Sequence, residues 1–339
     1  MSTLTEAAPA EAAAPVAAEL TYREAINAAL EDEMASDPSV VLLGEDVDAD
    51  GGVFKTNIGL PDKFPGRVLA TPICENGFMG VALGMSITGM RPVVEIMFAD
   101  FLPTAGDAIV NQLPKYRYMS GGQFTVPVTV RISSGGGAGF GTQHSATAES
   151  WYMAQPGMRI VTASSPQAAY ELLRAAIRNN DPVLFYEHKV LYTRKGLVQR
   201  GTIADIGTAR VLREGTDVTI VATLLMVEKS LAAAEALAAE GISAEVIDLR
   251  WIRPLDLPTV AASVAKTGRL LIAEEQVHAG GWGATIISEL AMAGTPFKAP
   301  PSAVSLPYDM PIPYSPPLED EIIPSPERIA DAARAALGR

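Results

Sequence analysis

Apolar residues recur at helical spacing in two long stretches of the chain. Residues 21–38 place apolar side chains on one helical face and end at Asp37-Pro38, because the residue before a proline avoids helical geometry; these residues are Tyr22, Ile26, Ala29 and Leu30. In SSPQAAYELLRAAIRNN, residues 164–180, Ser165 suits a helix cap and Pro166 suits the first turn. We therefore predict two amphipathic helices, with ordered structure beginning near Thr21.

Short apolar runs alternate with helical stretches along the whole chain. Each run fits one strand, and the runs lie at residues 39–46, 68–73, 91–101, 124–134, 181–189, 217–223, 242–250 and 269–275. Further helices are expected at 226–241 and 281–292. This alternation predicts an α/β fold with two parallel-sheet domains. We expect a flexible tail at 1–20, a first domain at 21–195, a linker at 196–205 and a second domain at 206–339.

Composition excludes several classes of protein. The chain carries 26 basic and 39 acidic residues, a net charge of −13, which disfavours a nucleic-acid partner. No apolar run approaches the ~20 residues that cross a bilayer, so no membrane association is expected. Cys74 is the single cysteine, and the N-terminal segment before Thr21 contains no Lys or Arg, so we expect the bacterial cytoplasm.

Several cofactor and nucleophile signatures are missing. The glycines of GGGAGFGTQH do not fit the G-x-G-x-x-G spacing, and neither a G-x-x-x-x-G-K-[ST] nor a G-x-S-x-G motif occurs. The three histidines, His144, His188 and His278, lie far apart in sequence, which argues against a zinc site. A self-contained nicotinamide-dependent dehydrogenase, kinase or serine hydrolase is therefore disfavoured.

Glu75 stands at the start of an expected helix that has a bare face. Gly77, Gly80 and Gly84 follow at steps of three and four, so one side of this helix carries no side chains. Another backbone or a flat ligand could approach that face closely. Alternatively, Glu75 only stabilises the helix by interacting with its dipole, as acids in a first turn commonly do.

His144 follows a glycine-rich segment, SSGGGAGFGTQ, and precedes SATAESWY, which is predicted to be helical. A mobile loop that delivers a histidine to the start of a helix suggests a group that reaches a substrate. An ordinary surface or core histidine is the alternative.

Met97 and Phe101 lie an even number of residues apart in the expected strand at 91–101. Even spacing places both side chains on one face of a sheet. Core packing is the default interpretation, and a flat heteroaromatic ligand held between them is the more specific one.

Many ordered segments resemble one known family. The sequence is similar to the β subunit of the thiamin-diphosphate-dependent decarboxylating component of 2-oxo acid dehydrogenase complexes, and most similar to the pyruvate type. The likeness runs from about Thr21 to the C-terminus through LLGEDV, GGVFKTNIGL, TPICENGFMGVALG, RPVVEIMFADF, DAIVNQ, KYRYMSGGQ, GTQHS, AAIRNNDPV, AEVIDLRWIRPLD and MPIPYSPPLED. The resemblance implies a pyrimidine-binding α/β domain followed by a transketolase-type C-terminal α/β domain.

The resemblance also implies roles for individual residues. Glu75 matches the glutamate that hydrogen-bonds the aminopyrimidine of thiamin diphosphate and acts as its acid–base partner. Met97 and Phe101 match positions that touch the pyrimidine, and Glu45 lies near the pyrimidine side in relatives. His144 matches a histidine near the thiazolium that is assigned to proton transfer and to the step with lipoamide.

Two metal ions follow from the resemblance. A potassium-type site of backbone carbonyls is implied at matching positions, which are Val128, Ala176, Ile177, Asn179 and Asp181. In AIRNNDP the acid falls at 181, where some relatives have it at 179. The Mg²⁺ and the diphosphate need a G-D-G motif, and this chain has Gly106-Asp107-Ala108 instead, so a separate α chain is expected to bind them.

The implied partners are an α subunit, in a heterotetramer of two α and two β chains, and the lipoyl acyltransferase core. An acidic group near the C-terminus, Glu319 to Glu321, is a candidate docking point for a basic domain of that core. The expected reaction is oxidative decarboxylation of pyruvate with acyl transfer to lipoyl groups. An acetoin or branched-chain 2-oxo acid dehydrogenase β subunit, or a non-catalytic scaffold on the same fold, are the alternatives.

Overall fold

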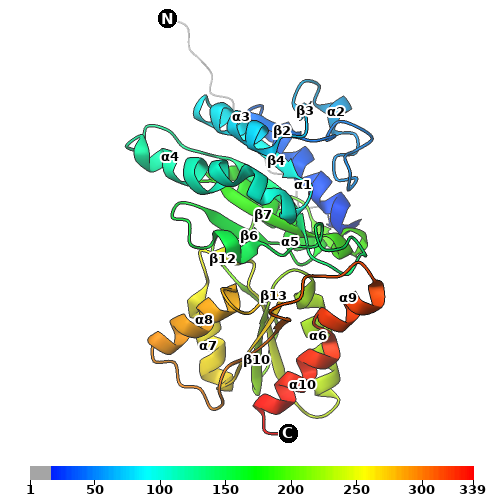
Figure 1. The fold of residues 1–339 in the computed structure, drawn as a ribbon, viewed down its shortest axis with the longest axis vertical. Helices are drawn as coiled ribbons and strands as arrows, with labels where there is room; N and C mark the ends of the chain where they lie inside the picture. Colours follow the sequence, from blue (N-terminus) through cyan, green and yellow to red (C-terminus); the bar gives the residue numbers. More distant parts are fainter. Residues whose placement is uncertain (1–16) are drawn as a thin grey trace, which may run out of the picture.

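The structure is a computed structural model that describes residues 17–339. Two α/β units follow one another along the long axis of the molecule, the N-terminal unit in blue to green and the C-terminal unit in yellow to red (Figure 1). Strands mostly run parallel within each unit, which confirms the predicted fold class. Within these residues, every helix is too short or too polar to span a bilayer.

The first unit is built on a seven-stranded sheet in the order β12-β6-β7-β5-β4-β2-β3. Six strands run parallel, and β12 joins antiparallel from the second half of the chain. The strands are β2 (Val40–Gly44), β3 (Val68–Ala70), β4 (Arg91–Ile96), β5 (Thr129–Ser134), β6 (Arg159–Thr162), β7 (Val183–His188) and β12 (Trp251–Arg253). Nearly all residues of β2, β4, β5 and β7 are buried, as expected when helices cover both faces of a parallel sheet.

The second unit has a five-stranded sheet in the order β14-β13-β10-β11-β9. Its strands are β9 (Arg210–Arg213), β10 (Val218–Ala222), β11 (Ala244–Asp248), β13 (Leu270–Val277) and β14 (Ser302–Leu306). Only β9 within this sheet pairs antiparallel, against β11. Its helices are α6 (Leu225–Ala238), α7 (Leu257–Thr267), α8 (Trp282–Met292), α9 (Pro316–Ile322) and α10 (Pro326–Ala336).

Three of the five α-helices described in the first unit lie where the sequence predicts a helix, whereas those at residues 60–63 and 113–119 were not predicted. The five helices are α1 (Tyr22–Ser36), α2 (Leu60–Lys63), α3 (Glu75–Ile87), α4 (Leu113–Met119) and α5 (Pro166–Arg178). Thr21 and Glu24 form a capping box at α1, and the Ser165 hydroxyl accepts from the Ala168 amide at α5. The apolar faces of α1 and α5 pack against each other and fix this side of the sheet.

One pair of strands crosses both predicted boundaries of the first domain. Ala17–Thr21 forms strand β1, which pairs antiparallel with β8 (Lys195–Gln199). Ordered structure therefore begins before Thr21, and the predicted linker at 196–205 begins inside a strand. The rest of the predicted tail, residues 1–16, lies outside the described residues.

Two local predictions around the candidate site are wrong. Strand β4 ends at Ile96, and Phe101 lies in a 3₁₀ helix, Ala99–Ala105, so Met97 and Phe101 do not share a sheet face. His144 is not at the start of a regular helix, because the following segment has only a short 3₁₀ helix, Glu149–Tyr152. The apolar composition of residues 97–101 is the same in a strand and in a buried 3₁₀ helix, so the sequence could not show where strand pairing stops.

Candidate active site

The segments that carry the candidate residues leave one edge of the seven-stranded sheet. Glu45 follows β2, Glu75 follows β3, Met97 follows β4, and the loop bearing His144 follows β5. Gly44, which ends β2, is the register partner of Ala70, which ends β3, and of Glu95, the last but one residue of β4. Ligands of open parallel sheets bind beyond the carboxyl ends of their strands, so the topology favours a site here.

Glu45 and Glu75 form an acidic pair at this edge. Glu45 is 6% exposed, and its Oε1 has no hydrogen-bond partner within the described residues. Burial raises the pKa of Glu45, and the negative charge of Glu75 raises it further. Glu75 is the partly exposed first residue of α3, next to Cys74, which makes no side-chain cap. A buried carboxylate oxygen without a partner is costly in an isolated chain and suggests a missing donor.

The glycine face of α3 is open, as predicted. Gly77, Gly80 and Gly84 are all exposed, and a Cβ added at Gly80 or Gly84 would have no neighbour within 4 Å. Phe78 is buried below the helix, whereas Ile73 is 84% exposed. The helix thus presents a bare strip, with an exposed apolar side chain nearby, on the surface of this chain.

His144 lies in an aromatic cluster centred on Phe98. The His144 ring meets Phe98 edge-on at 4.7 Å between ring centroids and Phe101 at 5.5 Å. Phe98 also contacts Phe101, Phe54 and Phe140 at centroid distances of 5.5, 5.6 and 5.7 Å. The structure therefore brings His144 and Phe101 together. Phe98 was missed from the sequence, although its three-residue spacing from Phe101 places both on one side of a helical turn.

Met97 and α3 border the same region. Met97 is partly buried between the end of β4 and the 3₁₀ helix that holds Phe101, and α3 contacts that 3₁₀ helix. The first turn of α3 carries Glu75. The acidic pair and the aromatic cluster are thus built on neighbouring elements at one sheet edge.

The residues of the predicted potassium site lie at the opposite edge of the sheet, before β5 and β7. One guanidinium nitrogen of Arg91 donates to the carbonyls of Ile177 and Asn179, both at 3.1 Å. The Val128 carbonyl accepts from the Val183 amide at 2.9 Å, and the Ala176 carbonyl accepts from the Asn179 amide at 3.1 Å.

The carboxylate of Asp181 is also occupied within the chain. It accepts from Arg117 at 2.5 Å and from Arg159 at 3.0 Å. Burial acts in the opposite direction, but these two guanidinium groups hold the pKa of Asp181 below its usual value. Among residues 17–339, no cluster of three or more His, Cys, Asp or Glu side chains could hold a metal ion.

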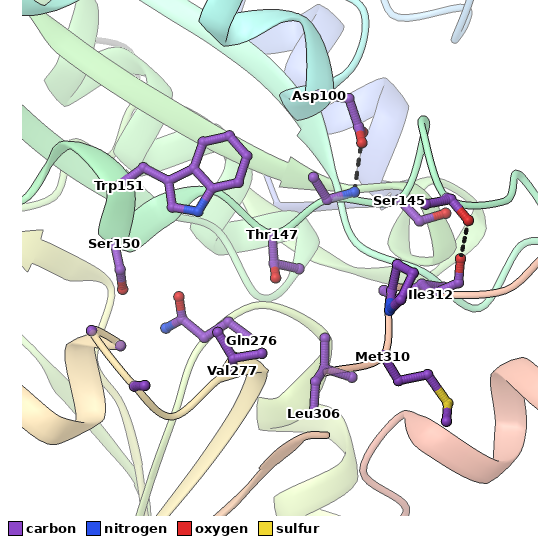
Figure 2. A pocket seen from close by; sticks show the side chains of 16 residues that line it. Asp100, Ser145, Thr147, Ser150, Trp151, Gln276, Val277, Leu306, Met310 and Ile312 are labelled. Atoms are coloured by element: carbon purple, nitrogen blue, oxygen red, sulfur yellow. Dashed lines mark hydrogen bonds between the residues drawn. The ribbon is translucent and has the colours of Figure 1, made fainter. Parts of the chain in front are cut away.

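A cavity of about 320 Å³ lies between the two units, and Thr142 and Ser145 of the His144 loop help to line it. Figure 2 shows Asp100, Ser145 and Thr147 of the first unit facing Gln276 and Met310 of the second. The residues predicted to hold the cofactor, Glu75, Met97 and Phe101, do not line it. The acidic pair and the aromatic cluster therefore lie at a sheet edge that is outside this cavity.

Comparisons with known proteins match both halves of the chain. The family model "Transketolase, pyrimidine binding domain" matches residues 18–195, and "Transketolase, C-terminal domain" matches residues 207–329. The pyruvate dehydrogenase E1 component subunit beta-1, mitochondrial, of Oryza sativa subsp. japonica is 44% identical over 100% of this chain and 93% of its own length. The chain belongs to the family of 2-oxo acid dehydrogenase β subunits.

Other members of this β-subunit family are similarly close. The pyruvate dehydrogenase E1 component subunit beta of Bacillus subtilis is 40% identical, over 94% of this chain and 99% of the relative. The acetoin:2,6-dichlorophenolindophenol oxidoreductase subunit beta of Cupriavidus necator is 42% identical, over 95% and 98%. A solved structure, "Split gene transketolase, inactive beta4 tetramer", aligns over 94% of this chain and 98% of its own with a TM-score of 0.78 and 25% identity.

Proposed function

We propose that the chain is the β subunit of a thiamin-diphosphate-dependent enzyme that decarboxylates pyruvate and passes the acyl group to lipoyl groups. The observation that carries this proposal is the acidic pair. Glu45 offers a buried carboxylate oxygen without a donor, beside Glu75, at the carboxyl ends of parallel strands. The match to the transketolase pyrimidine-binding family supports the same ligand.

The residues present fit the aminopyrimidine part of thiamin diphosphate. An aminopyrimidine carries both hydrogen-bond donors and acceptors, which complement a pair of acids. The exposed glycines of α3 leave room for a flat ring or a partner backbone at the same helix. Phe98, Phe101 and His144 provide an apolar wall with one titratable nitrogen group.

Thiamin diphosphate, when bound, supplies the carbon nucleophile and the electron sink for decarboxylation. Glu75 would then hold a proton at the ring nitrogen of the pyrimidine. Glu45, whose pKa is raised by burial and by the negative charge of Glu75, would accept a hydrogen bond from the same ring through its unpartnered Oε1. His144, held by Phe98 and Phe101, would move a proton during acyl transfer to lipoamide.

We further propose that a separate α chain binds Mg²⁺ and the diphosphate, in a heterotetramer of two α and two β chains. Asp107, in the position where G-D-G would be needed, is exposed and accepts from its own neighbours Asn111 and Gln112. Large apolar side chains remain exposed on this chain, among them Ile73, Val81, Tyr118 and Met119. Such exposure is typical of a surface that a partner covers.

Docking of the acyltransferase core near α9 needs a revised set of residues. Glu319 is 2% exposed and hydrogen-bonds within the chain, so it cannot receive a basic partner. Asp320 and Glu321 are exposed, and Leu318 beside them is 58% exposed. We propose docking through these three residues, and charge reversal at Asp320 and Glu321 that left core binding unchanged would overturn it.

The potassium site has no comparable support. The guanidinium of Arg91 already supplies positive charge to the carbonyls of Ile177 and Asn179, and Asp181 pairs with two arginines. Carbonyls and a carboxylate that already bind arginines do not fit a potassium site, so the proposed mechanism does not involve potassium.

The function is tested by co-expression with candidate α chains. Dye reduction is then measured with pyruvate, acetoin and 2-oxoisovalerate, with and without thiamin diphosphate. We expect pyruvate to give the highest kcat/KM and the activity to need thiamin diphosphate. Preference for acetoin would favour the second candidate, which the Cupriavidus necator relative supports. No thiamin-dependent turnover with any substrate would overturn the proposal.

A further inference from the structure

The loop that carries His144 is rich in glycine and therefore has few side chains to pack. Between Ser134 and Ala146 it contains Gly135, Gly136, Gly137, Gly139 and Gly141, and all of these except Gly136 have positive φ. Glycine-rich backbone loses much conformational freedom when it is fixed. The position of His144 therefore depends on what holds the backbone of this loop.

Three carboxylates accept hydrogen bonds from the loop backbone. Glu319 on α9 accepts hydrogen bonds from the amides of Gly137 at 2.6 Å and Gly139 at 3.1 Å. Glu275 on β13 accepts a hydrogen bond from the Gly136 amide at 2.6 Å. After His144, the Asp100 carboxylate accepts from the Ala146 amide at 3.0 Å, a bond drawn in Figure 2. Glu319 and Glu275 both come from the second unit, so the two units meet at this loop.

The segment that leads into and out of α9 packs on the same loop. A Cβ added at Gly136 would lie 2.9 Å from Ile323 and 3.1 Å from Ile312. The Thr142 hydroxyl donates to the Ile312 carbonyl at 3.1 Å (Figure 2). Residues 312–323 thus form a cradle that fits a loop without side chains at this point. A larger residue at Gly136 would require the side chains of Ile312 and Ile323 to shift.

We propose that Glu319 is a positioning residue for His144, acting through the amides of Gly137 and Gly139. The inference rests on the proposed role of His144 in acyl transfer. Charge-assisted hydrogen bonds from two backbone donors, two residues apart, hold the loop at two points. The second unit, which supplied no catalytic candidate from the sequence, would then set the geometry of the reaction.

A buried cation accompanies these acids. Lys189, after β7, is 7% exposed, and its Nζ has no hydrogen-bond partner within the described residues. Its Nζ lies 5.5 Å from the ring centroid of Phe98 and 5.8 Å from that of Phe140. Burial lowers the pKa of Lys189 to about 8, while Glu275, Asp100 and Glu319 act to raise it. The three loop-binding acids therefore share a positive charge that borders the aromatic cluster around His144.

The test uses Glu319→Gln in the complex with the α chain. Glutamine keeps the size of the side chain but can accept only through one atom, so one of the two amides loses its partner. Glu235→Gln is the matched control, because Glu235 is an exposed glutamate of α6 in the same unit. Hydrogen exchange of the peptide covering residues 135–146 is measured first. We expect exchange at least about tenfold faster in Glu319→Gln and unchanged in Glu235→Gln.

A double-variant cycle then separates positioning from general stability. Acylation of a free lipoyl domain is measured for Glu319→Gln, His144→Ala and the combined variant. If Glu319 acts through His144, the combined variant is no slower than His144→Ala. Additive losses, or unchanged loop exchange in Glu319→Gln, would overturn the inference. If Glu319→Gln does not assemble, Glu319→Asp keeps the charge but shortens the reach, and the same two readouts apply.

The catalytic role of His144 and the positioning role of Glu319 can be disproved separately. If His144→Ala acylates lipoyl groups normally, the role of His144 is wrong, and so is the positioning role that rests on it. If hydrogen exchange in the loop is nevertheless faster in Glu319→Gln, Glu319 does hold the loop, and the error lies in the proposed function of His144. Unchanged exchange with a slow His144→Ala identifies the failure as one of this inference alone.

Discussion

At the scale of the residue, buried acids are the most informative feature. Burial raises the pKa of Glu45, Glu187 and Glu274, although Arg131 and other donors partly offset the effect at the last two. Each of these carboxylates is costly to bury, and none would be expected in a core that served stability alone.

Glu149 gives a residue-scale prediction because it lies outside the proposed mechanism. It is 3% exposed, and burial raises its pKa to about 8. The folded chain therefore binds one more proton than the unfolded chain between about pH 4.5 and 8, so stability from this group is lost as the pH rises through that window. Glu149→Gln should gain about 1–4 kcal/mol relative to wild type between pH 5 and pH 8.5. Thermal unfolding at both pH values checks this, and a pH-independent difference would contradict it.

At the scale of the element, the first glycine of the loop after β5 lies against a buried imidazole. Gly135 has φ +83°, and an added Cβ would lie 2.0 Å from His188 Nε2. That imidazole is buried and bonded to Glu275 at 3.1 Å, so it cannot easily move aside.

Gly135→Ala is therefore expected to destabilise the chain by about 2–4 kcal/mol, combining positive-φ strain with overpacking. Gly121→Ala is the control, since Gly121 has φ +65° but no neighbour within 4 Å of an added Cβ. It should cost about 1–2 kcal/mol from backbone strain alone. Urea unfolding of both variants measures the difference, and equal losses would show that His188 gives way.

Elements with local signals could be predicted from the sequence, and elements set by packing could not. The caps and apolar stripes of α1 and α5 sit within their own residues, so both helices were predicted. Helix α10 was missed although Ser325 and Pro326 repeat the Ser165-Pro166 pattern of α5. The end of β4 at Ile96 depends on where its neighbours stop pairing.

The burial of Glu319 was beyond the sequence for a different reason. An acidic run has the same composition whether it faces water or a loop from the other unit. The bonds to Gly137 and Gly139 join residues about 180 positions apart in the chain. Likewise, family motifs in the sequence led to the prediction of Glu75, Glu45 and His144 as site residues, whereas the contacts around Phe98 required the structure.

At the scale of the whole molecule, the chain has the surface of a subunit. The α3 face bears exposed glycines together with Ile73 and Val81, which are 84% and 55% exposed. The residues proposed to contact the cofactor, Glu75, Met97 and Phe101, do not line the cavity between the two units. A partner chain that covers this face would complete the site.

Gly80→Leu tests this arrangement with effects of opposite sign. In the isolated chain an added Cβ at Gly80 meets no neighbour within 4 Å, and replacing a helical glycine stabilises α3 by up to about 1 kcal/mol. Association with the α chain should weaken at least tenfold, because the bare strip is filled. Unfolding of the isolated chain and sedimentation of the mixture measure the two effects. Unchanged association would show that α3 faces no partner.

The most direct test of the account is turnover by Glu75→Gln in the assembled complex. Glutamine keeps the shape at the start of α3 but cannot transfer a proton, so thiamin-dependent turnover of pyruvate should fall about 10²–10⁴-fold. Sedimentation should show the same assembly as wild type, because Glu75 makes no cap at the helix. Full activity in a correctly assembled complex would contradict the claim that this acid serves the cofactor.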